Sequence, residues 1–272
     1  MLKMSREELD WLCERIPDPP KSRFGGRPCA DKRKVVAGIF WVLDNGAKWK
    51  DLPRRFGSKS TVHRWFQKWV ADGIFEEILR SAGSLVGVFH DRENDRSLVE
   101  ERDGYRLYEC FIDGTFSKAK GGGAGIGLTR VGKGVKIMVL VDANGLPAAV
   151  HTASANHAES HLVQQLFDFM LPDAMPERVV GDKAYDSDRL DAQLAARGIE
   201  LIAPHRSNRL PENKTQDGRP LRRYKRRWTV ERTIAWLHNF RRLCIRWERS
   251  AALFQAFLHF SCTLLLLREV LG

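Results

Sequence analysis

Residues 136–154 read KIMVLVDANGLPAAVHTAS, two β-rich runs joined by an Asn-Gly pair. Asn-Gly suits the two-residue turns whose twist matches that of the flanking strands, so this stretch predicts a β-hairpin. Upstream of the hairpin, residues 105–116 (YRLYECFIDGTF) alternate and are rich in β-forming residues. Residues 127–134 (GLTRVGKG) nearly match a P-loop, but Gly replaces the final Ser or Thr and a strand follows, so we interpret them as a flexible loop.

Downstream of the hairpin, helical and strand patterns alternate. The segments are a helix at 159–170, a strand within 178–185, a helix at 187–198, a strand at 199–204, and helices at 222–244 and 251–271. This order predicts an α/β fold with a mixed sheet flanked by helices. Polar residues interrupt the apolar run of residues 251–271, which therefore predicts a buried helix and no membrane partner.

The first ~90 residues have helical periodicity. Within them, residues 44–79 predict a short helix, a turn at Gly57 and a second helix, which is the pattern of a helix-turn-helix. The second helix has an apolar side of Val62, Trp65, Phe66 and Trp69, and its outer side would carry the predicted DNA contacts Ser60, His63, Arg64 and Lys68. A small helical bundle without DNA contacts has the same pattern and stays open as an alternative.

The charge of the chain is concentrated in one segment. The 272 residues have a net charge of +11, and residues 206–249 hold fourteen Lys and Arg against four Asp and Glu. A basic segment of this kind is typical of a nucleic-acid-binding protein, although a solvated basic surface would have the same composition. The five cysteines form no CxxC pair and no secretory signal is evident, so we expect a protein of the reducing cytoplasm without a zinc site.

Three acids occupy notable places in this order of elements. Asp113 and Asp182 each follow an apolar β-run, and Glu231 lies in the helix after the last strand. A buried carboxylate is costly unless it is paired, and sharing a divalent cation removes that cost. Oxygen ligands suit Mg²⁺ or Mn²⁺, and two such ions ~4 Å apart can promote phosphodiester displacement. Each Asp by itself is more simply explained as a strand-end cap.

The helix around Glu231 adds candidate phosphate contacts. Residues seven before, four before and seven after Glu231 share its face of an α-helix, and these are Tyr224, Arg227 and His238. An ordinary amphipathic helix with an Arg227–Glu231 ion pair is the alternative. We interpret four tryptophans of the predicted helices as core residues and not as base-stacking platforms. They are Trp65, Trp69, Trp228 and Trp236.

These motifs carry a family resemblance. FIDGTF, VVGDKAYDS and YKRRWTVERTIAWLHNFRRL resemble the motifs of bacterial insertion-sequence transposases with an Asp-Asp-Glu (DDE) site, in the insertion-sequence-five group. Tyr224, Arg227 and Glu231 match the Y-x2-R-x3-E-x6-K signature of that superfamily, and His238 stands where the signature has Lys. Residues 46–69 also resemble the helical DNA-binding region of these transposases.

The resemblance implies a fold, a site and partners. It implies an RNase H-like catalytic domain over residues 105–272 behind a helical DNA-binding domain over residues 1–90. It implies Asp113, Asp182 and Glu231 as catalytic ligands of Mg²⁺ or Mn²⁺, with two ions. It also implies terminal inverted repeats and target DNA as partners, a homodimer or larger assembly on DNA, and a place at the bacterial nucleoid.

The expected function is metal-dependent cleavage of DNA at transposon ends followed by strand transfer into target DNA. Two alternatives stay open on the sequence. One is a related metal-dependent nuclease that cuts without joining. The other is a DNA-binding regulator built on a transposase that has lost its activity, which the presence of all three acids disfavours.

Overall fold

The computed structural model describes residues 3–18, 29–92, 98–101, 104–171, 175–214, 218 and 220–272. Its main sheet is built around the long strand β3 (Glu109–Ala119). Strand β5 (Gly132–Val141) pairs antiparallel with β3, and β6 (Pro147–Ser154) pairs antiparallel with β5. On the other side of β3 lie two parallel strands, first β7 (Arg178–Val180) and then β8 (Glu200–Ile202). The resulting order β6-β5-β3-β7-β8 is the strand order of an RNase H-like sheet, and it confirms the predicted mixed α/β class.

The hairpin predicted from Asn-Gly is present as β5 and β6. Its turn places Gly145 at φ 90°, a backbone conformation that glycine adopts without strain. The interpretation of residues 127–134 as a loop was wrong, because β4 (Gly127–Thr129) forms a second hairpin with the start of β5. The short separate strands β1 (Leu98–Glu101) and β2 (Gly104–Leu107) pair with each other.

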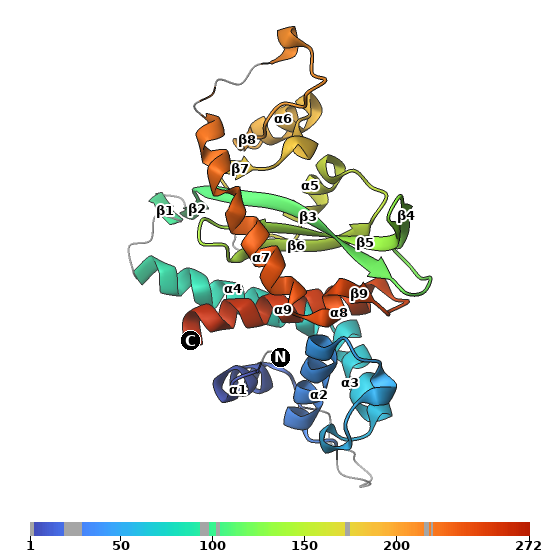
Figure 1. Cartoon of the computed structure of the whole chain (residues 1–272). Helices are drawn as coiled ribbons and strands as arrows, with labels where there is room; N and C mark the ends of the chain where they lie inside the picture. The colour runs from blue at the N-terminus through green and yellow to red at the C-terminus, as the bar shows by residue number, and fades with distance from the viewer. Residues whose placement is uncertain are drawn as a thin grey trace.

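Helices cover both faces of the sheet (Figure 1). Successive side chains of a strand point to opposite faces, so Ile137 and Val139 join one core cluster while Met138 and Leu140 join the other. The Met138 face is covered by α5 (Glu159–Phe167) and α6 (Asp188–Ala195). The Ile137 face is covered by α7 (Trp228–His238), α9 (Ala251–Leu271) and α4 (Ile74–Arg92).

The single helix predicted over residues 222–244 is divided in the structure. It begins as a 3₁₀ helix, η5 (Pro220–Arg227), continues as α7, and ends as α8 (Arg241–Cys244) before the short strand β9 (Ile245–Arg246). In η5, Arg223 and Arg226 both reach the buried carboxylate of Glu109, which suits a 3₁₀ turn because residues three apart are eclipsed there. After α7 the chain turns at Phe240, whose side chain is fully buried.

The N-terminal helices pack against the C-terminal helix. They are α1 (Arg6–Arg15), α2 (Lys32–Asn45) and α3 (Lys59–Ala71), with the 3₁₀ turns η1 (Trp49–Asp51) and η2 (Arg54–Phe56) between α2 and α3. Phe66 of α3 stacks on Phe257 of α9 with ring centroids 4.5 Å apart, and Phe75 of α4 lies 5.7 Å from Phe260. One hydrophobic core therefore extends from the sheet through α9 into the N-terminal helices.

Helix α9 is long and apolar enough, by length and composition, to cross a membrane, and it is the single such helix in the described residues. Most of it is enclosed by the protein, since twelve of its residues are buried. It contacts α4, β6 and α1. The prediction of a buried helix is confirmed.

Candidate active site

The two aspartates lie at the same level of neighbouring parallel strands. Val180 of β7 pairs with Phe111 of β3, and Asp182 and Asp113 each follow two residues later. Neighbouring strands are about 4.8 Å apart, so the register alone brings these residues close together. Asp182 also accepts a hydrogen bond from the backbone N–H of Ala184, 2.8 Å away, and so caps the 3₁₀ turn η3 (Lys183–Tyr185).

Arg227 connects Asp113 to Glu231. One guanidinium nitrogen donates to Asp113 Oδ2 at 2.8 Å and the other donates to Glu231 Oε1 at 2.5 Å. Because both carboxylates contact one planar guanidinium, they lie within roughly 8 Å of each other. Asp113 and Arg227 are 17% and 16% exposed, whereas Glu231 is 53% exposed, so the site opens to solvent on the Glu231 side.

Burial and charge act in opposite directions on these groups. Burial raises the pKa of Asp113, while the Arg227 charge and the Gly114 N–H partly offset that rise. Burial by itself would lower the pKa of Arg227, but the carboxylates of Asp113 and Glu231 more than compensate and raise it. A cation near Asp113 therefore favours the charged form of its carboxylate, and Arg227 supplies a positive charge here.

A fourth carboxylate approaches from the opposite face of the sheet. Glu159 is the first residue of α5, and its carboxyl carbon would lie 2.8 Å from a Cβ atom placed on Gly114. Glu159 also forms an ion pair with Lys136 of β5, with 3.2 Å between Nζ and Oε1. The fully buried Tyr185 lies under this group, and the charges of Glu159, Asp113 and Asp182 add to burial in raising the pKa of its phenol.

The other two predicted signature residues also lie beside Arg227 or β3. Tyr224 is in η5 rather than in an α-helix, but residues three apart are eclipsed in a 3₁₀ helix, and Arg227 lies 5.8 Å from its ring centroid. His238 ends α7 and is hydrogen-bonded to Thr115 of β3, with 3.2 Å between Nε2 and Oγ1. Burial lowers the pKa of His238, which favours the neutral form of its imidazole.

The donor set fits a divalent cation in its chemistry. All the acids here offer carboxylate oxygens, the ligands that Mg²⁺ and Mn²⁺ prefer. Among the described residues, no three His, Cys, Asp or Glu side chains already form a metal-binding group. The Arg227 guanidinium instead occupies the space between Asp113 and Glu231, so metal binding there requires Arg227 to release at least one of them.

Several cations of the basic segment pair with buried acids of the same protein. Arg223 and Arg226 pair with Glu109, whose side chain is fully buried. Arg242 is buried and pairs with Glu248 at 2.5 Å, and Arg246 is also buried. Charge counting alone therefore overstates the surface available to nucleic acid, and the exposed cations of this segment include Arg222, Lys225, Arg226, Arg241 and Arg249.

Helix α3 presents three of its four predicted DNA contacts to solvent. Ser60, Arg64 and Lys68 are spaced four residues apart and are exposed. The prediction of an outward His63 was wrong: its ring stacks on Trp49 with centroids 4.6 Å apart, in a cavity that Arg242 also lines. His63 faces inward because Trp49 of η1 covers its ring and Arg242 and Trp247 line the same cavity, and the local helical pattern does not reveal these neighbours.

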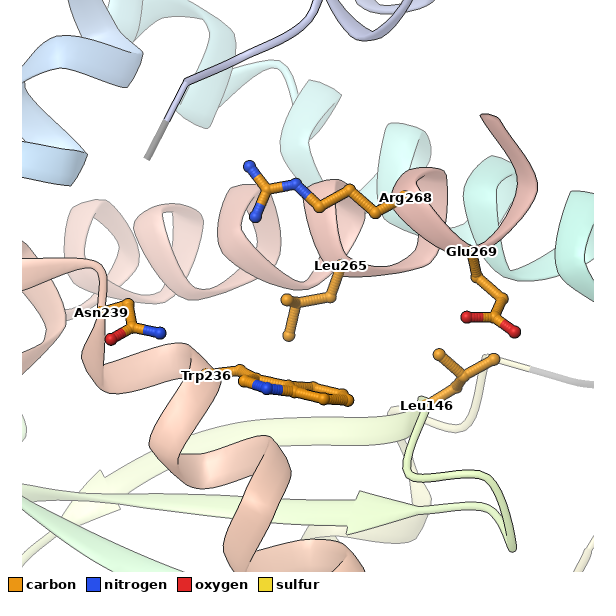
Figure 2. Close-up of a pocket in the computed structure, with 6 residues that line it drawn as sticks. All are labelled: Leu146, Trp236, Asn239, Leu265, Arg268 and Glu269. Carbon is orange, nitrogen blue, oxygen red and sulfur yellow. The ribbon is translucent and has the colours of Figure 1, made fainter. Parts of the chain in front are cut away.

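The interpretation of all four tryptophans as core residues was also wrong in part. Trp228 and Trp236 on α7 are 54% and 37% exposed, and the guanidinium of Arg232 lies over both rings. Figure 2 shows Trp236 beside Leu265 of α9. These residues line a pocket with a volume of about 240 Å³. Trp236 lies five residues after Glu231, on a different side of α7, so this pocket is separate from the acids.

Sequence reasoning missed Glu159 and Glu109. Glu159 begins α5 and resembles an ordinary helix-start residue, and Glu109 begins β3 and resembles an ordinary strand residue. Their partners Lys136 and Arg223 are distant in sequence. The one available signal was the glycine of FIDGTF, since a glycine inside a strand can mark the close approach of another group.

Comparisons with known proteins concern both parts of the chain. A family model described as "Transposase DDE domain" matches residues 106–266, and one described as "Putative transposase of IS4/5 family" matches residues 4–79. Among solved structures, the piggyBac transposase in a synaptic complex with hairpin DNA is 11% identical, with a TM-score of 0.49 over 94% of this chain and 69% of that chain.

Two relatives are described as transposases of insertion sequences. The "Putative transposase for insertion sequence element IS402" of Burkholderia cepacia is 38% identical over 144 residues, which is 50% of this chain and 64% of that protein. The "Putative transposase for insertion sequence element IS6501" of Brucella ovis is 27% identical over 133 residues, 49% of this chain and 98% of that protein. The chain thus spans less than two thirds of the length of the IS402 relative.

Proposed function

The chain belongs to the family of transposases with a DDE domain, and we propose that it cleaves DNA at transposon ends and transfers the freed 3′ strand to target DNA. In this proposal Asp113, Asp182 and Glu231 are the catalytic acids and hold Mg²⁺ or Mn²⁺, with two ions. The supporting observation is the convergence of these acids, which come from β3, the end of β7 and α7.

The chain's own residues would prepare the phosphate for attack. When bound, the metal would activate the attacking water and take up charge on the leaving 3′ oxygen. Arg227, released from one acid, presents a planar fork of N–H donors that matches two oxygens of a phosphate. The imidazole of His238 can donate an N–H to the DNA backbone at the position where the family signature has a lysine.

The remaining partners follow from the exposed surfaces and the family. Residues 1–90 would bind the terminal inverted repeats through Ser60, Arg64 and Lys68 of α3, and residues 105–272 would carry the chemistry. Tyr224 and the exposed arginines beside it would contact the DNA leading to the acids. The protein would act as a homodimer or larger assembly on DNA at the bacterial nucleoid, since two transposon ends must be held together.

Neutral substitution of each acid tests this assignment. Asp113→Asn, Asp182→Asn and Glu231→Gln should each lower Mg²⁺-dependent cleavage of DNA carrying the element's own ends by more than about 10²-fold. Such a loss exceeds what is usual for substituting a residue that only supports a metal ligand. Binding of the same DNA in a gel shift without metal should stay within a few-fold of wild type, because the acids do not contribute to phosphate attraction.

Glu177→Gln is the matched control, since this half-buried acid lies before β7 at the opposite end from Asp182. Retained cleavage in any of the three variants removes that residue from the catalytic set. Cleavage without joining of pre-cut ends would identify a nuclease instead. Binding without any metal-dependent cleavage by the wild type would identify a DNA-binding regulator.

A further inference from the structure

We propose that Glu159 is a fourth carboxylate of the divalent-metal site, oriented by the hydroxyl of Tyr185. This inference rests on the proposed function, because it adds a residue to the metal site of that reaction. Glu159 comes from α5, on the face of the sheet opposite α7. The metal would therefore be approached from both faces of β3.

The first observation is the space beside Gly114. A Cβ atom at this position would lie 2.8 Å from the carboxyl carbon of Glu159 and 2.9 Å from its Oε1. A Cβ atom could fit here only if the Glu159 carboxylate moved away, so the glycine directly after Asp113 is what lets that carboxylate reach the strand. The charge of Glu159 also contributes to the raised pKa of Asp113, which means that the two carboxylates lie close enough to repel each other.

The second observation is an unsatisfied hydroxyl. Tyr185 is 0% exposed, and its phenol oxygen has no hydrogen-bond partner among the described residues. A buried hydroxyl without a partner is costly, so a group that completes its bonding is expected nearby. After burial, Glu159 has the largest effect on the pKa of this phenol, raising it through its charge and through a side-chain hydrogen bond that falls short of normal geometry, and the charges of Asp113 and Asp182 raise it further. A hydrogen bond from Tyr185 to one of them would fix its orientation toward a shared cation.

The third observation is the way in which the acids are neutralised. Lys136 pairs with Glu159 on one face of the sheet, as Arg227 pairs with Asp113 on the other. The Lys136 ammonium is also held by the backbone carbonyl of His157 at 2.9 Å. Two protein cations thus balance acids that a divalent ion could balance instead. Lys136 is consequently a competitor of the metal for Glu159.

A purely structural role for Glu159 is the contrary hypothesis. A glutamate in the first turn of a helix stabilises the helix through its dipole without any ligand. Such a role predicts an effect on stability but none on metal affinity. The two roles can therefore be separated by measuring Mn²⁺ binding and unfolding on the same variants.

Titration of the full-length protein with Mn²⁺, followed by electron paramagnetic resonance of the free ion, provides the test. Glu159→Gln should weaken Mn²⁺ binding at least about 10-fold, the lower end of what losing a supporting group costs a metal site. Tyr185→Phe should weaken it less than Glu159→Gln does. Glu200→Gln, which removes an acid paired with Arg178 at the far end of β7, should leave binding unchanged.

Lys136→Gln gives an effect of opposite sign. It should strengthen Mn²⁺ binding by freeing Glu159, and the double variant Lys136→Gln/Glu159→Gln should show no such gain, since the coupling passes through Glu159. Thermal unfolding of every variant verifies that it is folded. If Glu159→Gln binds Mn²⁺ like wild type while Asp113→Asn does not, the inference is wrong and the proposed function survives. If Asp113→Asn also binds like wild type, the metal site of the proposed function is wrong as well.

Discussion

At the scale of single residues, three consecutive positions of β3 serve two faces of the sheet. Asp113 and Thr115 point toward α7, where they contact Arg227 and His238. Gly114, between them, faces α5 and leaves room for Glu159. The alternation of a strand therefore allows one short motif to gather groups from two helices that lie on opposite sides of the sheet.

Two glycines of this region should respond differently to an added methyl group. At Gly114 the obstructing atoms are the end of the flexible Glu159 side chain, so Gly114→Ala should displace that side chain at a cost of about 1 kcal/mol or less. At Gly134 a Cβ would lie 2.2 Å from the Phe116 ring, which cannot move as easily, so Gly134→Ala should cost about 1–3 kcal/mol. Urea unfolding measures both, and equal losses would contradict this account.

At the scale of elements, the segment from η5 to α8 changes its helical type where its contacts require it. The 3₁₀ form lets Arg223 and Arg226 share Glu109, and the α form of α7 lets Val230 and Leu237 pack on the sheet. Arg227 lies at the junction of the two forms and contacts both aspartate and glutamate of the site. The predicted face of Tyr224, Arg227 and Glu231 thus survives, although the continuous α-helix does not.

Helix α3 offers an element whose role can be tested independently of the acids. Arg64 is exposed on the face that it shares with Ser60 and Lys68. Arg64→Ala should weaken binding to transposon-end DNA and reduce the salt dependence of that binding by about one counterion, because one phosphate contact is lost. Gel shifts at several salt concentrations measure both quantities.

Arg189→Ala is the control for α3, since Arg189 is an exposed arginine on α6, which Figure 1 places far from α3. It should leave affinity and salt slope unchanged if α3 is the DNA-binding helix. An equal loss in both variants would indicate general electrostatic attraction and not a specific contact at α3.

At the scale of the whole molecule, α9 connects the sheet to the N-terminal helices. The half-buried side chain of Gln255 links α9 to the sheet: it accepts from the N–H of Thr152 in β6 at 2.8 Å and donates to the buried His259 of α9 at 2.7 Å. Because the amide nitrogen of Gln255 can only donate, Nε2 of His259 must be the acceptor, and the imidazole is neutral.

This neutral histidine should make stability depend on pH. Burial lowers the pKa of His259 from 6.5 to about 4, so the unfolded chain binds a proton in this range that the folded chain does not. The free energy of unfolding should therefore fall as the pH decreases from 6.5 toward 4, by roughly 3 kcal/mol from this group. Urea unfolding at pH 7 and pH 4.5 should show a smaller difference for His259→Gln than for wild type.

His161→Gln provides the comparison for the pH experiment, because His161 is exposed on α5. This variant should retain the pH dependence of the wild type. If His259→Gln retains it as well, other groups are responsible and the neutral state of His259 does not contribute.

Much of the arrangement could be predicted from local patterns. Apolar alternation and the Asn-Gly turn predicted β3, β5 and β6, and the helical period predicted α5, α6 and α9. The family signature selected Asp113, Asp182 and Glu231. The β4 hairpin is local, but its three-residue strand is too short to show a periodic pattern. The division of the last helices and the inward side of His63 depend on partners distant in the chain, and local periodicity contains no information about them.

The sequence by itself determined the order of the elements, the class of the fold and the acids to consider, because hydrophobic period and turn chemistry act over a few residues. Only the tertiary structure decided which charges meet. Register placed Asp182 beside Asp113, the junction of η5 and α7 placed Arg227 between Asp113 and Glu231, and the missing side chain of Gly114 admitted Glu159. Electrostatic interactions depend on distance through space and on burial, and both are set only when strands and helices pack.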